Sequence, residues 1–254
     1  MNQIKIIDIY SGNAPLSFDK LVLDGYRGVI FKAGQGEWPD VPRIQPTWWN
    51  DAKLAGLERG WYWLVDARYR PSNQFEAMKK ATNLDFGELG MWVDCEKPYT
   101  TMKDGDYWKT PYCGFNPIYD FMYAVQQTKA SKFAEFLPGL YTCPGFWNFI
   151  SGKMSIGAQQ WFAKAPLWTA QYPYIFTQFS KPSIYGAWTK WTLWQYREGP
   201  DVNLFNGTVD EYIAFFGLEV GPMPTPIPIP VPTPTTIVEI TVKMSDGRLE
   251  TIYP

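Results

Sequence analysis

Residues 90–96 read GMWVDCE, an apolar run that ends in two acids, and Lys97 and Pro98 follow directly. Side chains alternate between the two faces of a β-strand, so Asp94 and Glu96 share one face while Cys95 points to the other. Proline cannot continue a central strand, which places both acids at the strand's C-terminal end. Two carboxyls on one face, about 6–7 Å apart at Cβ, have the spacing that acid-assisted glycoside cleavage requires. The stretch therefore predicts a glycosidase-type carboxylate pair.

Composition excludes several other chemistries. The 254 residues include no histidine, which removes Ser-His-Asp and Cys-His catalysis and most transition-metal sites. Three cysteines, without a CxxC pair, argue against a disulfide framework and a zinc site. The formal charge of −2 gives no basic surface for nucleic acid. We therefore expect carboxylate chemistry with no metal, cofactor or nucleic-acid partner.

Aromatic residues are unusually frequent. The chain has 13 Trp, 16 Tyr and 16 Phe, more than a core needs, and Trp and Tyr are the side chains that stack on sugar rings. Most of them are still expected to serve as packing. No apolar run approaches 18 residues, so we expect no membrane span.

Short apolar strands alternate with helical segments along most of the chain. This alternation over about 215 residues predicts an α/β fold, specifically an irregular TIM-like β/α barrel with a parallel sheet. Ser72 is the expected N-cap of the third helix. The expected strands are 4–9, 28–33, 61–65, 89–94, 139–142, 167–170, 192–196 and 201–205, and the expected helices are 18–23, 47–59, 72–83, 117–136 and 209–216.

Acids and aromatics recur where these strands end. Active sites of such barrels lie at the C-terminal ends of the strands. One acid at a strand end is more often a turn-former or a helix cap, so the prediction depends on the whole set. The set consists of Asp8, Asp94, Glu96, Tyr141, Trp168, Trp194 and Tyr196.

The C-terminal part has a different composition. Seven prolines alternate with other residues from Pro222 to Pro234, which predicts a stiff polyproline-like spacer of roughly 40 Å. Beyond it, two β-type runs flank Ser245-Asp246-Gly247, a hairpin signature. The expected organisation is a barrel over 1–220, a proline-rich linker over 221–236 and a small β-hairpin element over 237–254. So short an element cannot hold its own core, so it docks, self-associates or belongs to a longer protein.

The ordered motifs resemble one known family. Their order and spacing are similar to those of the family 25 glycoside hydrolases, which are N-acetylmuramidases (lysozymes). The resemblance covers residues 4 to about 216. The matching pieces are IIDIYS at 6–11, FKAGQG at 31–36, WNDAKLAGL at 49–57, GWYW at 60–63, VDCE at 93–96, LYT at 140–142, LWTAQY at 167–172, and WQY at 194–196 with DVN at 201–203.

The resemblance implies cleavage of the β-1,4 bond between N-acetylmuramic acid and N-acetylglucosamine. It makes Glu96 the general acid, and gives Asp94 the stabilisation of the oxocarbenium-like state or the orientation of the substrate's 2-acetamido group. Asp8 and Asp201 would hold the acidic centre. Crowded acids raise one another's pKa, and Glu96 is expected to be the raised one. The expected substrate contacts are Lys32, Tyr62, Trp63, Tyr141, Trp168, Tyr172, Trp194 and Tyr196.

Some features depart from the family pattern. Trp63 stands where the family often has histidine, and the aromatic-rich segments 99–119 and 172–191 are expected to form long loops over the barrel mouth. Two other functions stay open: a glycan-binding protein without turnover, and a chitinase-like glycosidase.

The expected partner is bacterial peptidoglycan. The N-terminus lacks the pattern of a signal peptide. We therefore expect synthesis in a host cytoplasm and action on the wall after release, as in a phage endolysin, or a virion-associated enzyme. The C-terminal element would bind the wall or self-associate.

Overall fold

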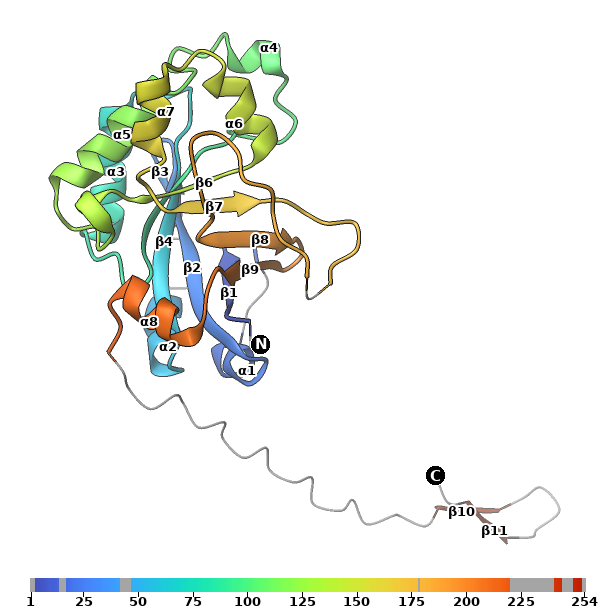
Figure 1. Ribbon diagram of the computed structural model, residues 1–254. Helices are drawn as coiled ribbons and strands as arrows, with labels where there is room; N and C mark the ends of the chain where they lie inside the picture. The colour runs from blue at the N-terminus through green and yellow to red at the C-terminus, as the bar shows by residue number, and fades with distance from the viewer. Residues whose placement is uncertain are drawn as a thin grey trace. The chain divides into compact units, whose positions relative to one another are not determined.

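A closed β-barrel forms the first unit of the protein. The computed structural model describes residues 3–13, 17–41, 47–177, 179–219, 240–243 and 249–252. Eight strands pair in a ring, because β1 hydrogen-bonds to both β2 and β9 (Figure 1). In chain order they are β1 (Lys5–Ile9), β2 (Tyr26–Gln35), β4 (Glu58–Leu64), β5 (Gly90–Asp94), β6 (Gly139–Thr142), β7 (Leu167–Ala170), β8 (Leu193–Arg197) and β9 (Asp201–Phe205).

The direction of the last strand corrects the expected all-parallel sheet. β9 runs antiparallel to both β8 and β1, while the other neighbours in the ring are parallel. The first residue of β9, Asp201, pairs directly with Asp8 near the end of β1. The reversal therefore brings a further acid to the rim where the parallel strands end. A short strand, β3 (Trp38–Pro39), folds back on the end of β2 at the same rim.

The helices differ from the expected ones mainly at their ends. The expected helix 47–59 ends early, because Gly56 takes a φ of +87° and Glu58 and Arg59 already belong to β4. The helix expected over 117–136 is likewise interrupted, with Lys129 at a φ of +56°. Arg70, not Ser72, is the N-cap of α3. The helices are α1 (Phe18–Leu23), α2 (Trp48–Leu54), α3 (Pro71–Thr82), α4 (Asp104–Tyr107), α5 (Asn116–Gln127), η1 (Ala134–Phe136), α6 (Pro144–Ser151), α7 (Ile156–Phe162) and α8 (Val209–Phe216).

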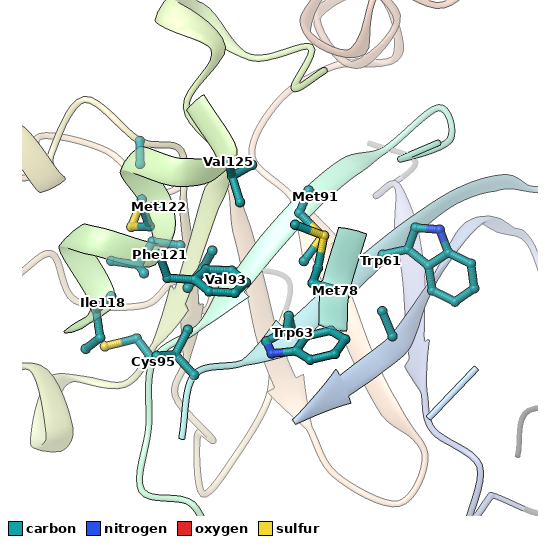
Figure 2. Packing of buried hydrophobic residues seen from close by; sticks show 14 of the residues in the cluster. Trp61, Trp63, Met78, Met91, Val93, Cys95, Ile118, Phe121, Met122 and Val125 are labelled. Atoms are coloured by element: carbon teal, nitrogen blue, oxygen red, sulfur yellow. The ribbon is translucent and has the colours of Figure 1, made fainter. Parts of the chain in front are cut away.

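Strand alternation separates two hydrophobic regions. Met91 and Val93 of β5 point outward and pack against Met78 of α3 and Phe121 of α5 (Figure 2). Trp92, between them in sequence, belongs to a second cluster with Trp168 of β7 and residues of α8. The same alternation predicts that Asp94 and Glu96 lie on the side of Trp92, toward the barrel interior.

The second unit is described by itself. Its strands β10 (Ile240–Lys243) and β11 (Leu249–Ile252) pair antiparallel as a two-stranded sheet. The expected proline spacer lies outside the described residues. Within the described part of the chain, no helix is long and apolar enough to cross a membrane.

Candidate active site

Five acids converge on one cavity at the barrel rim. The cavity has a volume of about 240 Å³ and contains all four acids expected from the sequence. Asp8 and Asp94 come from β1 and β5, Glu96 follows β5, and Asp201 begins β9. Its lining consists of Asp8, Tyr62, Asp94, Glu96, Thr100, Tyr141, Trp168, Tyr172, Gln195, Glu198 and Asp201.

Asp8 is fixed by two side-chain amides. Its Oδ2 accepts hydrogen bonds from Gln195 Nε2 at 2.9 Å and Asn203 Nδ2 at 2.7 Å. The pKa of Asp8 is raised to about 7, mainly by burial and also by the nearby Asp201, while the hydrogen bonds from the two amides act in the opposite direction. Asp8 is therefore a buried carboxyl that holds a proton near neutral pH.

Asp94 and Glu96 form the central pair. Burial is the main reason why the pKa of each acid is raised. The pKa of Asp94 lies well above its usual value, and the pKa of Glu96 is about 7. Glu96 raises the pKa of Asp94 further, and the Lys32 ammonium lowers the pKa of both acids. We expected a raised pKa for Glu96, and the structure raises the pKa of Asp94 as well, because both carboxyls are buried.

One oxygen of Asp94 has an unused acceptor capacity. Asp94 Oδ1 is buried and has no hydrogen-bond partner among the residues that the structure describes. A buried polar atom without a partner carries a free-energy cost of about 1–3 kcal/mol. This unsatisfied oxygen lies in the acid cluster, where an N–H or O–H group of the substrate would donate a hydrogen bond to it.

Aromatic side chains form one wall of the cavity. Trp168 meets Tyr141 edge-on, with ring centroids 4.8 Å apart, and Tyr62 at 6.2 Å. Trp168 Nε1 donates to Asn203 Oδ1 at 2.7 Å. The hydroxyls of Tyr141 and Tyr172 donate to Gln195 Oε1 at 3.0 and 2.5 Å. These contacts fix the wall and connect it to the amides that hold Asp8.

Four of the eight expected substrate contacts lie outside the acid cavity, namely Lys32, which is described below, and three aromatic residues. Trp63 is fully buried in the outer core near Met78 and Val93 (Figure 2), because it follows the inward-facing Tyr62 by one residue. Trp194 is buried and donates to Gln171 O at 2.7 Å. Tyr196 stacks on Phe176 with ring centroids 4.4 Å apart. None of the three lines the acid cavity.

Sequence reasoning missed the residues that organise the site. Gln195 lies between Trp194 and Tyr196 on β8, so the alternation that turns both aromatics away turns the amide inward. Asn203 occupies the equivalent inward position on β9, two residues after Asp201. Strict alternation along β8 and β9 was the signal that could have found both. Thr100 and Glu198 also line the cavity, from loops where no such periodicity exists.

Lys32 lies beside the acid cavity. Its Nζ donates to Gln35 Oε1 at 3.1 Å and lies 6.0 Å from the centre of the Tyr62 ring. The ammonium belongs to the lining of a neighbouring cavity, and its charge still acts on Asp94 and Glu96.

Metal binding has no geometric support in the part of the chain that the structure describes. No group of three or more Cys, Asp or Glu side chains there is arranged to hold an ion.

Comparison with known proteins identifies the family. The sequence model of glycosyl hydrolases family 25 matches residues 7–203, which include the four expected acids. The chain belongs to glycosyl hydrolase family 25. Membership in family 25 confirms the predicted glycoside hydrolase and the assignment as a lysozyme. Among curated proteins, none matches the chain by sequence.

Solved structures share the fold. A family 25 lysozyme from Aspergillus fumigatus is 23% identical, with a TM-score of 0.64 over 84% of this chain and 99% of that one. A muramidase from Trichobolus zukalii is 24% identical, with a TM-score of 0.62 and the same coverage of 84% and 99%. The catalytic domain of an endolysin from a bacteriophage of Listeria monocytogenes is 17% identical, with a TM-score of 0.56 over 85% and 98%. At these identities the likeness shows the family 25 fold alone.

Proposed function

We propose that this family 25 lysozyme hydrolyses the β-1,4 bond between N-acetylmuramic acid and N-acetylglucosamine in peptidoglycan, with Glu96 as general acid. The observation that carries the residue roles is the convergence of five acids on one aromatic-walled cavity at the barrel rim. Carboxyls in such a setting can divide the roles of proton donor and charge stabiliser, because their environment decides which of them stays protonated.

Glu96 donates the proton in this proposal. With a pKa of about 7, a large share of Glu96 is protonated near neutral pH, so the carboxyl can transfer its proton to the glycosidic oxygen as the C1–O bond breaks. A water molecule later adds to C1, and its proton returns to Glu96. The net reaction is hydrolysis, and the enzyme ends in its starting protonation state.

Asp94 orients the substrate. Its unpartnered Oδ1 is a suitable acceptor for the N–H of the 2-acetamido group of the sugar whose C1 reacts. An acetamido group held in this way presents its carbonyl oxygen to C1 as internal nucleophile. Asp8 and Asp201 contribute through the field of the acid cluster, and Asp8 is held in place by Gln195 and Asn203.

The Glu96→Gln variant tests the acid role. We expect turnover on purified peptidoglycan to fall about 100-fold or more, because the amide cannot donate a proton of suitable acidity. The wild type should lose activity as the pH rises through about 7, where Glu96 ionises. Turbidity loss of purified walls measures both effects. Glu135→Gln, a matched change at an exposed residue of η1, should act like wild type. Near-normal turnover of Glu96→Gln would refute the assignment.

Product analysis separates the other functions. Mass spectrometry of the digest should show N-acetylmuramic acid at the new reducing ends. Plain chitooligosaccharides released from chitin, with no products from peptidoglycan, would favour the chitinase-like alternative. A protein that sediments with walls and releases no sugar would be the binding protein without turnover.

The cellular setting is part of the proposal. We infer an endolysin that is made in a host cytoplasm and reaches the wall after release, or a related virion-associated enzyme. The fold shared with an endolysin catalytic domain supports this setting. The proline-rich linker and the hairpin element would then attach the barrel to the wall or to another copy of the chain.

A further inference from the structure

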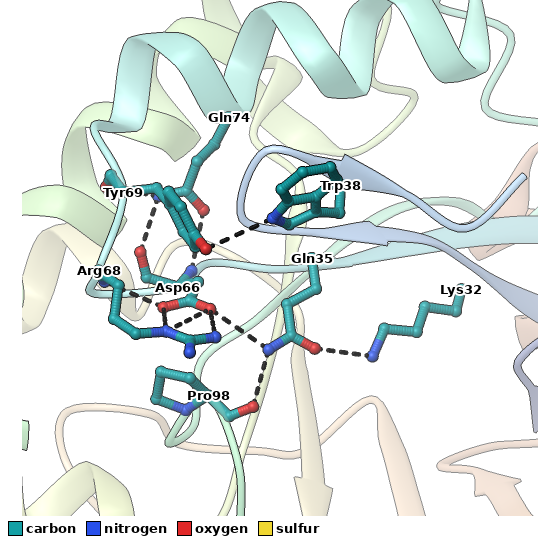
Figure 3. A network of polar contacts seen from close by, with 8 residues as sticks. All are labelled: Lys32, Gln35, Trp38, Asp66, Arg68, Tyr69, Gln74 and Pro98. Atoms are coloured by element: carbon teal, nitrogen blue, oxygen red, sulfur yellow. Dashed lines mark hydrogen bonds and ion pairs between the residues drawn. The ribbon is translucent and has the colours of Figure 1, made fainter.

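A second cavity lies on the same rim, beside the acid cavity. Its volume is about 360 Å³, and its lining includes Tyr10, Lys32, Gln35, Trp38 and Arg68. Figure 3 shows the last four of these residues. Tyr10 follows Asp8 of the acid cavity by two residues. Gln35 donates to the carbonyl oxygen of Pro98 at 2.7 Å, two residues beyond Glu96. The two cavities therefore lie near one another at this rim, and their linings share no residue.

Arg68 is held rigidly at this cavity. Its Nε and Nη2 donate to the fully buried Asp66, at 2.9 Å to Oδ1 and 2.6 Å to Oδ2 (Figure 3). The guanidinium also lies over the rings of Tyr69 and Tyr99, at 5.6 and 5.3 Å from their centres. The Arg68 side chain nevertheless stays 42% exposed. A guanidinium fixed on one edge by a buried carboxylate is preorganised to bind an acceptor with its remaining donors.

Most of the unused hydrogen-bonding groups in this cavity are donors. Its two acids are already engaged, since Asp40 accepts from the backbone N–H and the hydroxyl of Ser11, and Asp66 accepts from Arg68 and Gln35. Lys32 Nζ has three N–H donors, and one hydrogen bond goes to Gln35. Acceptor-rich groups of a ligand therefore fit here, in contrast to the acid cavity next to it.

Two exposed aromatic rings accompany these donors. Trp38 is 66% exposed and Tyr10 is 46% exposed. Trp38 lies on β3, and its Nε1 donates to the hydroxyl of Tyr69 at 3.4 Å. Large aromatic side chains left open beside charged donors suit a ligand with both an apolar ring face and oxygen acceptors.

We propose that this second cavity is the lactyl subsite of the same N-acetylmuramic acid whose C1 reacts: Trp38 and Tyr10 contact its sugar ring, while Arg68 and Lys32 bind the oxygens of its 3-O-lactyl substituent, which is attached to the carbon next to the one that bears the 2-acetamido group. The lactyl group offers a carboxylate in peptide-free glycan and an amide carbonyl where the stem peptide is attached. N-acetylglucosamine lacks this substituent, so the subsite would distinguish peptidoglycan from chitin. The inference rests on the proposed function and adds the residues that select the substrate.

Binding to two soluble ligands tests the subsite without turnover. In a Glu96→Gln background, isothermal titration calorimetry compares a peptide-free tetrasaccharide of alternating N-acetylglucosamine and N-acetylmuramic acid with chitotetraose. Adding Arg68→Gln should weaken binding of the muramic acid ligand about 10-fold, the effect of losing one charge-assisted hydrogen bond, and change chitotetraose binding less than 2-fold. Arg70→Gln, the same charge change outside this cavity, should leave both affinities unchanged.

Two further variants keep the test decisive. Arg68→Gln leaves the buried Asp66 without its cation, so Arg68→Lys serves as a milder change. Lysine keeps the positive charge but lacks the paired N–H donors of the guanidinium. We expect about 3-fold weaker binding of the muramic acid ligand alone. Trp38→Ala, at an exposed position, should weaken binding of both ligands. Equal losses for both ligands in the Arg68 variants, or no loss, would overturn the subsite.

This result is independent of turnover. If the wild type cleaved no peptidoglycan but the ligand difference persisted, the proposed function would fail while the subsite stood. Normal cleavage without the ligand difference would remove the subsite alone.

Discussion

At the scale of single residues, the site contains buried acids whose pKa the fold raises, and this lowers the free energy of unfolding near neutral pH. Asp8 illustrates this effect, because its pKa of about 7 lies above the value of about 3.9 for an unfolded chain. The folded state therefore binds the Asp8 proton more tightly than the unfolded state does. Below pH 4, Asp8 is protonated in both states and hardly affects the free energy of unfolding. As the pH rises from about 4 to 7, the ionisation of Asp8 in the unfolded state lowers the free energy of unfolding, and above pH 7 this loss no longer grows.

The Asp8→Asn variant should therefore be more stable than wild type at pH 8 and similar to it at pH 4. The amide oxygen of asparagine can still accept from Gln195 and Asn203, which both donate to one oxygen of Asp8. We expect a gain of about 1–3 kcal/mol in the free energy of unfolding at pH 8, measured by calorimetry at both pH values. Asp120→Asn, at an exposed position, is the control and should show no such difference. An equal change at pH 4 and pH 8 would contradict the argument.

Individual site residues could be predicted where an acid ended a strand. Asp8, Asp94 and Glu96 were expected at such ends and reach the same cavity. Asp201 reaches it too, but it begins β9, and only the family resemblance indicated it. Aromatics were harder, because their chemistry is the same in a core and in a cleft. Tyr62 and Trp63 are adjacent and equally aromatic, yet only Tyr62 faces the cavity. The register of the strand decides between them, and composition carries no information about it.

At the scale of elements, most strands could be predicted from their apolar runs, and the direction of one was predictable in principle. Only Glu198, Gly199 and Pro200 separate β8 from β9. A parallel crossover needs about a dozen residues or more, so this short connection requires an antiparallel pair. Helix ends were less accessible. α5 ends two residues before Lys129, whose φ of +56° is rare for a residue other than glycine and has no clear sequence signal.

Close packing inside the barrel makes a further prediction at this scale. A Cβ atom on Gly139 of β6 would lie 2.2 Å from Cε3 of the fully buried Trp92. Gly139→Ala should therefore lower the free energy of unfolding by about 1–3 kcal/mol, because the indole cannot move without disturbing the interior. Urea denaturation measures the change. Gly105→Ala is the matched control, since a Cβ there meets nothing within 4 Å and lies in α4. Equal stability of the two variants would show that Trp92 has room to shift.

At the scale of the whole molecule, the barrel and the C-terminal element are separate compact units. The barrel closes on itself through the pairing of β1 with β2 and β9, and its described helices end with α8 at Phe216. Among the residues that the structure describes, its core clusters consist of residues between Ile4 and Leu218. These described residues give the barrel a hydrophobic core of its own.

A chain that ends at Gly221 should consequently keep the fold and the chemistry of the barrel. We expect its melting temperature to lie within about 2 °C of the full chain, since the truncation removes no residue of the described core clusters. Its kcat/KM on soluble peptidoglycan fragments should be unchanged. Sedimentation with insoluble walls should fall several-fold if residues 222–254 bind the wall, because two linked binding units hold a surface more tightly than one. If those residues self-associate instead, light scattering will show a smaller particle after truncation. A large loss of thermal stability would mean that the barrel depends on the C-terminal unit, and would contradict this division of the chain.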